Sequence, residues 1–321
     1  MLEFEVLVRD GSLPSLFPGV RAEPKVLRVG AVQCAWHPDA AHHTAVLREG
    51  VGLAVQNGAR VVLLQELTLS PYFCFDPDVP DALARFGEDV DAGPTVTLAR
   101  ELAAAHGVFV HASLYERTPD GRGFNTAICV DPAGALLART RKTHIPEFDN
   151  YHEDRYFEPA GEDAPVVEVA GAMFAFPTCW DQWFPELARA LSLDGAEVIV
   201  YPTAIGSEPS WPDVDTQPMW RQTIVANGLA NSTFMIAVNR IGEEGPLSFY
   251  GSSFISDPYG RVIVDAPRDR PAVLVADLDL AQRAEAATFG LLYTRRPERY
   301  TRLQHGTDLG RGPHPPSARP R

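Results

Sequence analysis

Apolar strand-like runs that alternate with amphipathic helical segments are the feature that most constrains the fold of this chain. Residues 60–66, RVVLLQE, form a continuous apolar run, which is typical of a strand buried on both faces. Residues 93–107 begin with Gly-Pro and end with Gly, the asymmetry expected of a helix. This alternation predicts an α/β fold in which helices cover a sheet, and it leaves open which α/β fold that is.

The alternation runs from residue 27 to about residue 303, and no change in composition marks a linker within it. We expect strands at 27–35, 60–66, 108–117, 125–131, 136–142, 165–176, 196–202, 234–242, 250–257, 261–267 and 272–280, and helices at 40–59, 93–107, 184–195 and 215–230. One domain therefore covers 27–303. Residues 1–26 are predicted to be an N-terminal extension with one strand-like piece, FEVLV. Residues 304–321 are predicted to be a flexible C-terminal tail, or a segment that lies on a partner subunit.

Charge and cysteine pattern argue against several classes of protein. A formal net charge of −14 at pH 7 disfavours binding to nucleic acid or to an anionic membrane, and it suits a small cationic ligand. No apolar run approaches the ~20 residues that span a bilayer. Residues 1–15 lack the basic start and apolar centre of a signal peptide. The four cysteines form no CxxC pair, so we expect a reduced, cytoplasmic chain.

Three residues with reactive side chains each lie just past the end of an apolar strand. Glu66 ends VVLLQE, Lys142 follows LLARTR, and Cys179 follows MFAFPT. Ligand sites of α/β sheets collect beyond strand ends, so these side chains can meet there. Lys142 is also unusual because 28 residues are Lys or Arg, yet only Lys25 and Lys142 are lysines. The sequence therefore places an ammonium, not a guanidinium, at this position.

Each of the three has a chemical interpretation and an ordinary one. Cys179 precedes a helix start, and the helix start together with a nearby lysine would favour the thiolate. Glu66 ends so apolar a strand that its carboxylate needs a partner, which makes it a candidate general base. The ammonium of Lys142 can point at a developing oxyanion. The ordinary alternatives are a thiol that fills a gap in the core, a glutamate that faces water and a solvated lysine.

The remaining patterns are weaker. GRGFNTA at 121–127 faintly resembles a dinucleotide-binding loop, but it opens a strand where that motif requires a helix. The histidines show no metal-ligand spacing, so we expect no metal. His144 and His152 leave open a Cys–His protease, in which one of them would be oriented against Cys179.

The segments around Glu66, Lys142 and Cys179 resemble the three catalytic boxes of the nitrilase superfamily of carbon–nitrogen hydrolases. These are LLQELTLSPYF, RKTHIP and CWDQWFPE, and the likeness runs from about residue 27 to 303. It implies an αββα four-layer sandwich that forms a homodimer or a higher homo-oligomer, with no metal or organic cofactor. It also implies that Cys179 is the nucleophile, Glu66 the general base and Lys142 the group that stabilises the tetrahedral intermediate, with Glu153 as a supporting glutamate.

Within this superfamily the chain resembles the branch of N-carbamoylputrescine amidases. The likeness lies in CWDQWFPE, YPTAIGSEP, NRIG and FYGSSFI. It implies hydrolysis of N-carbamoylputrescine to putrescine, carbon dioxide and ammonia, in which Glu208 meets the distal ammonium. Tyr72, Trp180, Trp183 and Ala204 would line the rest of the substrate site. Glu208 as a loop glutamate in solvent is the alternative.

Other functions stay open because the sequence departs from that branch. EFDNY at 147–151 replaces a Gly-rich DGPGY segment, which makes the loop bulkier and more acidic. One alternative is another superfamily amidase or ureido hydrolase, β-ureidopropionase-like or an ω-amidase, although an acidic substrate calls for an arginine and the loops around 147–158 are acidic. A non-catalytic binding protein on the same fold is a further alternative, disfavoured by intact Glu66, Lys142 and Cys179.

Overall fold

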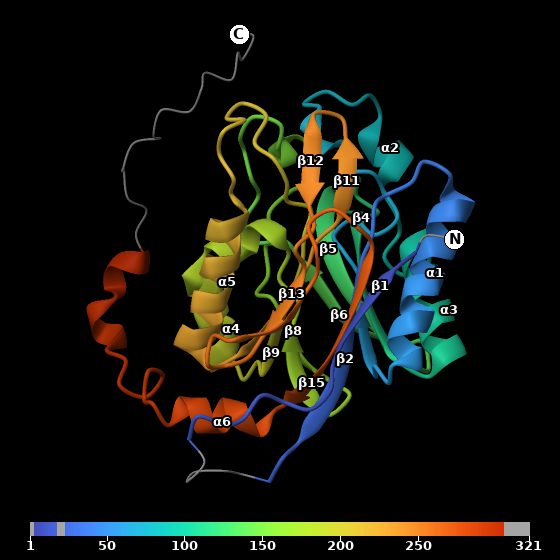
Figure 1. Cartoon of the computed structure of the whole chain (residues 1–321). Coiled ribbons are helices and arrows are strands. Elements are labelled where there is room, and N and C mark those ends of the chain that lie inside the picture. The colour runs from blue at the N-terminus through green and yellow to red at the C-terminus, as the bar shows by residue number, and fades with distance from the viewer. Residues whose placement is uncertain (1–2, 18–22, 305–321) are drawn as a thin grey trace.

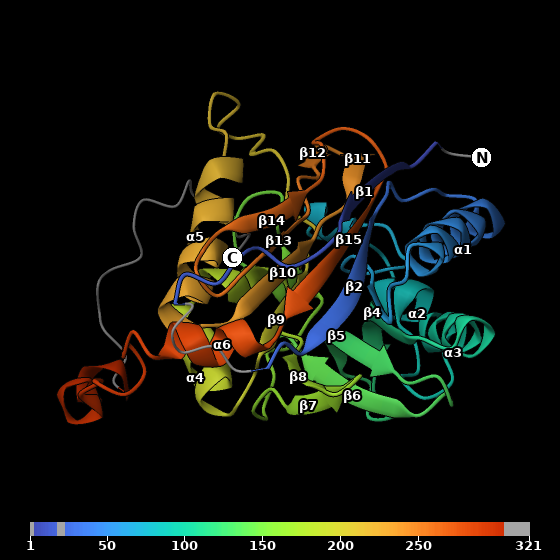
Figure 2. The same cartoon turned by 60° about the horizontal axis from the view of Figure 1, so that its bottom comes forward.

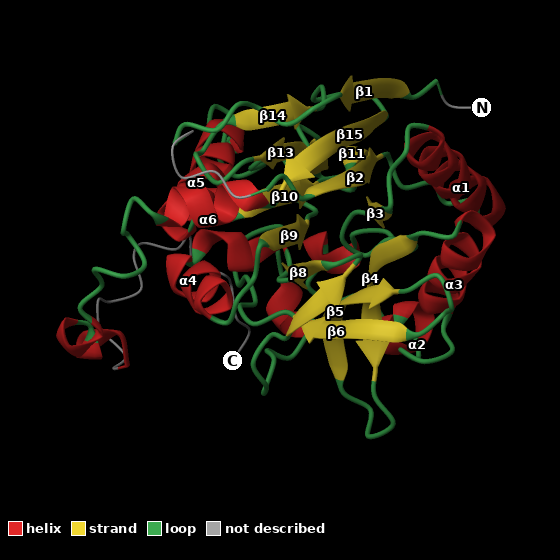
Figure 3. Cartoon of the chain, turned by 90° about the horizontal axis from the view of Figure 1, so that it is seen from below, coloured by secondary structure: helices red, strands yellow, loops and turns green. Residues whose placement is uncertain are grey.

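The structure is a computed structural model that describes residues 3–17 and 23–304. In this part of the chain two β-sheets lie face to face, and helices cover the outer face of each sheet (Figures 1 and 3). The predicted αββα four-layer sandwich is therefore confirmed. The predicted flexible tail lies outside the described residues, except for Gln304.

The larger sheet has seven strands within the described residues. Their order across the sheet is β1 (Glu5–Arg9), β15 (Ala272–Asp279), β2 (Val26–Gln33), β3 (Val61–Leu63), β4 (Phe109–Arg117), β5 (Gly123–Val130) and β6 (Leu136–Arg141). β15 is parallel to β1 and antiparallel to β2. The last strand of the chain thus lies between two strands from its N-terminal part (Figure 2). The predicted N-terminal extension contributes β1, an edge strand of this sheet.

The smaller sheet has six strands in the same part of the chain. Their order is β14 (Val262–Asp265), β13 (Phe254–Ser256), β10 (Phe234–Val238), β9 (Val198–Pro202), β8 (Ala172–Ala175) and β7 (Val166–Val169). β11 (Ile241–Glu244) and β12 (Leu247–Tyr250) form a separate antiparallel hairpin. Several strands of both sheets end toward the same side of the sandwich (Figure 1).

Helices α1 (Ala40–Gln56) and α3 (Pro94–His106) cover the larger sheet, and α4 (Pro185–Leu193) and α5 (Gln217–Asn231) cover the smaller one (Figure 3). Local chemistry fixes their ends. The Asp39 carboxylate accepts the first free N–H groups of α1, and α3 ends at Gly107, whose left-handed φ of 67° suits glycine. No helix in the described ranges is long and apolar enough to cross a membrane.

The shorter helical elements lie in the connections. They are α2 (Ala82–Phe86), α6 (Ala281–Ala287) and the 3₁₀ turns η2 (Phe73–Phe75), η3 (Glu153–Arg155), η4 (Cys179–Trp183), η5 (Pro297–Arg299) and η6 (Thr301–Gln304). Their sequences are too short for a periodic signal, so the sequence did not predict them.

Three apolar layers hold the sandwich together. The layer between the sheets contains Phe174, Ile236 and Leu274, all fully buried. A second layer packs α1 and α3 on the larger sheet, and a third packs α4 and α5 on the smaller one around the buried Trp220. Burying each such side chain contributes about 1.5–3 kcal/mol, so the sheets form a stiff base for the loops at their ends.

Two expectations about strands were wrong. Residues 165–176, expected as one strand, form the hairpin β7–β8, because Ala170 and Gly171 both adopt positive φ, 53° and 85°, and reverse the chain. The three strands expected between 234 and 267 are five. The segment 234–242 breaks into β10 and the start of β11, and β12 lies almost wholly before the strand expected at 250–257, with which it shares only Tyr250.

Candidate active site

Glu66, Lys142 and Cys179 are brought together from three separate strand ends. Glu66 lies three residues beyond β3, Lys142 directly follows β6, and Cys179 opens η4 shortly after β8. β3 and β6 belong to the larger sheet and β8 to the smaller one. The site therefore lies where the two sheets face each other, and the strand-end argument from the sequence placed all three residues correctly.

Lys142 is the centre of a buried ionic cluster. Its Nζ lies 3.0 Å from Oε1 of Glu66 and 2.7 Å from Oε2 of Glu153, and all three side chains are at most 1% exposed. The Tyr72 hydroxyl donates to the other Glu153 oxygen at 3.0 Å, and the Asn125 amide donates to Oε1 of Glu66 at 2.7 Å. These bonds compensate for the cost of removing the charges from water, which is several kcal/mol per ion.

The charges of the cluster shift the pKa values of its members. Burial alone would lower the pKa of Lys142, but the carboxylates of Glu153 and Glu66 outweigh it and raise the pKa well above the usual value. Burial raises the pKa of Glu153, and the Lys142 ammonium opposes that rise. The two carboxylates thus stabilise the charged form of Lys142 within the cluster.

Cys179 interacts electrostatically with the whole cluster, but its thiol is not a resting thiolate. Burial is the main cause that raises the pKa of Cys179 well above the usual value, and Glu66 and Glu153 add to it. Lys142 and a hydrogen bond with the Ala204 backbone act in the opposite direction and are weaker. Lys142 favours the thiolate as expected from the sequence, but desolvation and two carboxylates outweigh this one ammonium.

The backbone of the nucleophile turn is strained. Cys179 has φ 39°, a left-handed value that side-chain-bearing residues rarely adopt. Such conformations cost about 1–3 kcal/mol and persist only where the surroundings hold them. Strain of this kind therefore requires interactions that fix the turn.

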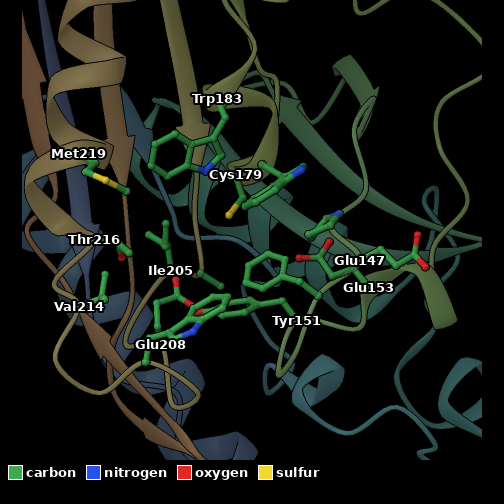
Figure 4. Close-up of a pocket in the computed structure, with 15 residues that line it drawn as sticks. Glu147, Tyr151, Glu153, Cys179, Trp183, Ile205, Glu208, Val214, Thr216 and Met219 are labelled. Carbon is green, nitrogen blue, oxygen red and sulfur yellow. The ribbon is translucent and has the colours of Figure 1, made fainter. Parts of the chain in front are cut away.

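A pocket of about 500 Å³ opens onto Cys179 (Figure 4). It is lined by Pro146, Glu147, Phe148, Tyr151, Glu153, Cys179, Trp180, Trp183, Ala204, Ile205, Glu208, Trp211, Val214, Thr216 and Met219. The walls are mostly apolar and aromatic. Three glutamates are the only charged residues among these lining residues, and no arginine or lysine is among them. A ligand that enters this pocket thus meets negative charge and apolar surface.

Four of the five predicted substrate-site residues line this pocket: Trp180, Trp183, Ala204 and Glu208. The fifth, Tyr72, is not among the lining residues; it lies behind the site and its hydroxyl donates to Glu153. Glu208 is half-buried, and burial raises its pKa to about 7. Figure 4 shows Glu208 and Glu153 on different sides of the Cys179 sulfur.

Tyr151 connects the two loops that form the pocket mouth. Its hydroxyl donates to the Ser207 carbonyl and accepts the Gly206 N–H, both at 3.2 Å. The EFDNY segment, where the sequence departs from its relatives, is thereby fixed to the loop that carries Glu208. The role of Tyr151 depends on contacts with residues 206–207, which the sequence alone does not indicate.

Arg240 supports the loop that carries Glu66, a role the sequence analysis did not identify. Its fully buried guanidinium donates to the carbonyls of Glu66 at 2.7 Å and Leu67 at 3.1 Å, and it pairs with Glu244. Leu67 has φ 47°, so these bonds hold a strained residue next to Glu66. Arg240 lies in the NRIG segment quoted above, but no feature of the neighbouring sequence indicates that its side chain is buried.

The two histidines considered for a Cys–His protease make contacts with residues other than Cys179. Nδ1 of His144 lies 2.8 Å from the Asp181 carboxylate, and its ring stacks on Phe184. His152 donates its backbone N–H to the Cys74 carbonyl. Neither contact orients an imidazole against Cys179. Within residues 3–17 and 23–304, no group of three His, Cys, Asp or Glu side chains could hold a metal ion.

Comparisons with known proteins agree with this fold. The family model of carbon-nitrogen hydrolases matches residues 28–288. Citrullinase of Francisella tularensis is 35% identical over 283 residues, covering 86% of this chain and 98% of that protein. N-carbamoylputrescine amidase of Arabidopsis thaliana is 36% identical over 281 residues, covering 85% of this chain and 93% of that protein. The crystal structure of a carbon-nitrogen hydrolase from Helicobacter pylori matches with a TM-score of 0.80 at 27% identity, covering 89% of this chain and 99% of that one.

The fold and these relatives define an enzyme of the nitrilase superfamily. The chain belongs to the carbon–nitrogen hydrolase family, whose model spans most of its length. The family resemblance inferred from the three boxes is therefore confirmed.

Proposed function

We propose that this enzyme hydrolyses N-carbamoylputrescine to putrescine, carbon dioxide and ammonia. The observation that carries the proposal is the pocket: apolar walls and three glutamates, with no basic lining residue, lead to the Cys179 thiol. An apolar four-carbon chain with a terminal ammonium is complementary to such a surface. Relatives named N-carbamoylputrescine amidase, at 33–36% identity, support this choice.

A second candidate substrate is citrulline, because one relative is named citrullinase. Citrulline carries the same ureido group, but its distal carbon bears a carboxylate beside the ammonium. That carboxylate would enter a pocket whose charged lining residues are all glutamates. No arginine or lysine is among the described residues that line the pocket, so the desolvation of this carboxylate is uncompensated there, which favours the substrate that lacks it. The same reasoning disfavours ureido acids such as N-carbamoyl-β-alanine.

Glu208 is the group that binds the distal ammonium. Its carboxylate is half-buried, burial raises its pKa, and no basic side chain among the described residues opposes that rise. A cation placed beside it would supply the missing counter-charge and lower that pKa. The aromatic walls at Trp180 and Trp183 cover the carbon chain between the ammonium and the ureido group.

Acylation begins with proton transfer from the Cys179 thiol to Glu66. A base is required because the raised pKa keeps the thiol protonated at rest. The sulfur then forms a bond with the ureido carbon, and the oxyanion develops against the Lys142 ammonium and the backbone N–H of Trp180. The tetrahedral intermediate expels the terminal amine as ammonia, which receives the proton held by Glu66. An S-carbamoyl thioester remains on the enzyme.

Deacylation uses the same groups in reverse. Glu66 takes a proton from water, the hydroxide oxygen bonds to the carbonyl carbon, and the carbon–sulfur bond breaks to restore the thiol. The product carbamate loses carbon dioxide to give the amine. Glu153 does not touch the substrate in this scheme; its bonds to Lys142 at 2.7 Å and Tyr72 at 3.0 Å position the ammonium.

The partner that the surface favours is a second copy of this chain. The segment after α6 stands away from the body of the sandwich (Figure 1), and its large side chains Phe289, Tyr293 and Leu303 are 70%, 78% and 67% exposed. Exposed apolar groups of this size gathered on one segment indicate an interaction site. Light scattering after chromatography tests it: Phe289→Ser with Tyr293→Ser should lower the mass of any oligomer.

Ammonia release from a substrate panel tests the proposed reaction. N-carbamoylputrescine should have the highest kcat/KM, ahead of citrulline and N-carbamoyl-β-alanine. Cys179→Ala should abolish the release. Preference for citrulline would overturn the substrate, and an active Cys179→Ala variant would overturn the mechanism.

A further inference from the structure

The carboxylate of Asp181 joins the two segments that carry the nucleophile and the lysine. Its Oδ2 accepts the backbone N–H of Thr178 at 3.0 Å, next to Cys179. Its Oδ1 accepts the backbone N–H of His144 at 2.8 Å, two residues after Lys142, and the backbone N–H of Thr143 donates to Oδ2 at 3.4 Å. Asp181 is fully buried, so these bonds are shielded from water.

The His144 side chain completes this arrangement. Its Nδ1 lies 2.8 Å from Oδ1 of Asp181, and its ring lies flat on Phe184, with centroids 3.6 Å apart and an interplanar angle of 4°. Phe184 is the residue between η4 and α4. The imidazole thus contacts the nucleophile turn twice, through Asp181 in its middle and through Phe184 at its end.

We propose that Asp181 and His144 form a clamp that positions Cys179 relative to Lys142; the proposal rests on the proposed cysteine mechanism and adds two positioning residues to it. The strained φ of 39° at Cys179 requires such a restraint. The turn that carries the thiol comes from the smaller sheet, and the strand that carries the ammonium comes from the larger one. The clamp ties these two elements together close to the reacting atoms.

Two substitutions separate the hydrogen bond from the ring stacking. His144→Phe keeps a flat ring for Phe184 and removes the donor to Asp181. His144→Asn places an amide N–H close to the position of Nδ1 and removes the stacked ring. His106→Asn, at the exposed end of α3, is the matched control.

The first readout is the rate at which iodoacetamide alkylates Cys179, followed by mass spectrometry of the intact protein and its peptides. Cys34, Cys74 and Cys129 are fully buried, so the modification is selective for Cys179. We expect His144→Phe to slow alkylation by about 10- to 100-fold, since a displacement of about 1 Å at a reacting group has an effect of that size. His144→Asn should recover most of the rate, and His106→Asn should match the wild type.

The second readout is ammonia release from N-carbamoylputrescine, with the melting temperature of each variant as a reference. kcat should fall in His144→Phe in parallel with alkylation, while KM changes less than about threefold because the pocket walls are intact. Wild-type alkylation in His144→Phe would overturn the clamp. The clamp would also be overturned if the alkylation rate and kcat fell equally in both His144 variants, in proportion to the fall in their melting temperatures. A merely structural role predicts that pattern. If the wild type released no ammonia, the proposed function would fail. The alkylation rates of the variants would still test whether Asp181 and His144 position Cys179.

Discussion

The replacement of Glu208 by Gln is the perturbation that most directly tests how this enzyme chooses its substrate. The change keeps the size and shape of the side chain and removes its negative charge. N-carbamoylputrescine and N-butylurea form a matched pair of substrates, because they share the ureido group and the four-carbon chain and differ in the distal ammonium. The charge of Glu208 should therefore affect only the first of them.

The expected magnitude follows from the environment of Glu208. A hydrogen bond between charged groups contributes about 1.5–3 kcal/mol, and partial exposure of this glutamate places it in the lower half of that range. Since about 1.4 kcal/mol corresponds to a factor of ten, KM for N-carbamoylputrescine should rise about 10- to 30-fold. KM for N-butylurea should change less than about twofold, because no charge–charge interaction is lost.

The pH dependence of KM for N-carbamoylputrescine is a second test of the role of Glu208. Burial raises the pKa of Glu208 to about 7, so the carboxyl group is mainly neutral at pH 6 and mainly ionised at pH 8. The substrate ammonium remains charged throughout this interval. KM for N-carbamoylputrescine should therefore fall as pH rises from 6 to 8 in the wild type, and this fall should disappear in Glu208→Gln.

The assay is ammonia release coupled to glutamate dehydrogenase, with KM and kcat measured for both substrates at each pH. Glu147→Gln is the control for a general loss of negative potential, because Glu147 lines the same pocket. An equal rise in KM for the charged and the neutral substrate would refute the assignment of Glu208. A larger rise in KM for N-carbamoylputrescine in Glu147→Gln than in Glu208→Gln would indicate that Glu147 binds the substrate ammonium.

Three further substitutions test the supports of the site. Lys142→Met leaves Glu66 and Glu153 without their shared cation, so urea denaturation should show a loss of about 3–5 kcal/mol, partly restored by adding Glu153→Gln. Arg240→Lys cannot reproduce the fork of donors to the Glu66 loop and should lower the unfolding free energy by about 2–3 kcal/mol in the same assay. Gly206→Ala puts a Cβ 2.4 Å from the Ser248 carbonyl oxygen, so the displaced loop should raise KM more than it lowers kcat. An unchanged unfolding free energy in Lys142→Met or Arg240→Lys, or an unchanged KM in Gly206→Ala, would contradict the contacts on which that prediction rests.

The positions of the reactive groups were predictable because they depend on local sequence and on a general property of α/β sheets. Glu66, Lys142 and Cys179 each end a recognisable apolar strand, and strand ends gather at one edge. Lys142, one of only two lysines in an arginine-rich chain, pointed to a site that requires a compact cation. The structure places that lysine in contact with both glutamates.

The supporting groups were not predictable, because their roles depend on burial and on contacts between distant segments. Asn125, Asp181 and Arg240 are common polar residues whose partners lie up to 174 positions away. The direction in which the pKa of Cys179 shifts was not predictable for the same reason. It depends on the sum of two carboxylates, one ammonium and desolvation, and the sequence gives none of their distances.

The position of β15 between β1 and β2 has a consequence for biosynthesis. β2 leaves the ribosome early, but its hydrogen-bonding partner at Ala272–Asp279 is synthesised near the end of the chain. At translation rates of about 5–20 residues per second the interval is of the order of 10–50 s, during which the β2 edge is unpaired. Completion of this sheet therefore comes late in synthesis, and a premature stop codon just before β15 would release a chain in which β1 has lost its partner and β2 is an open edge, with a strong tendency to aggregate.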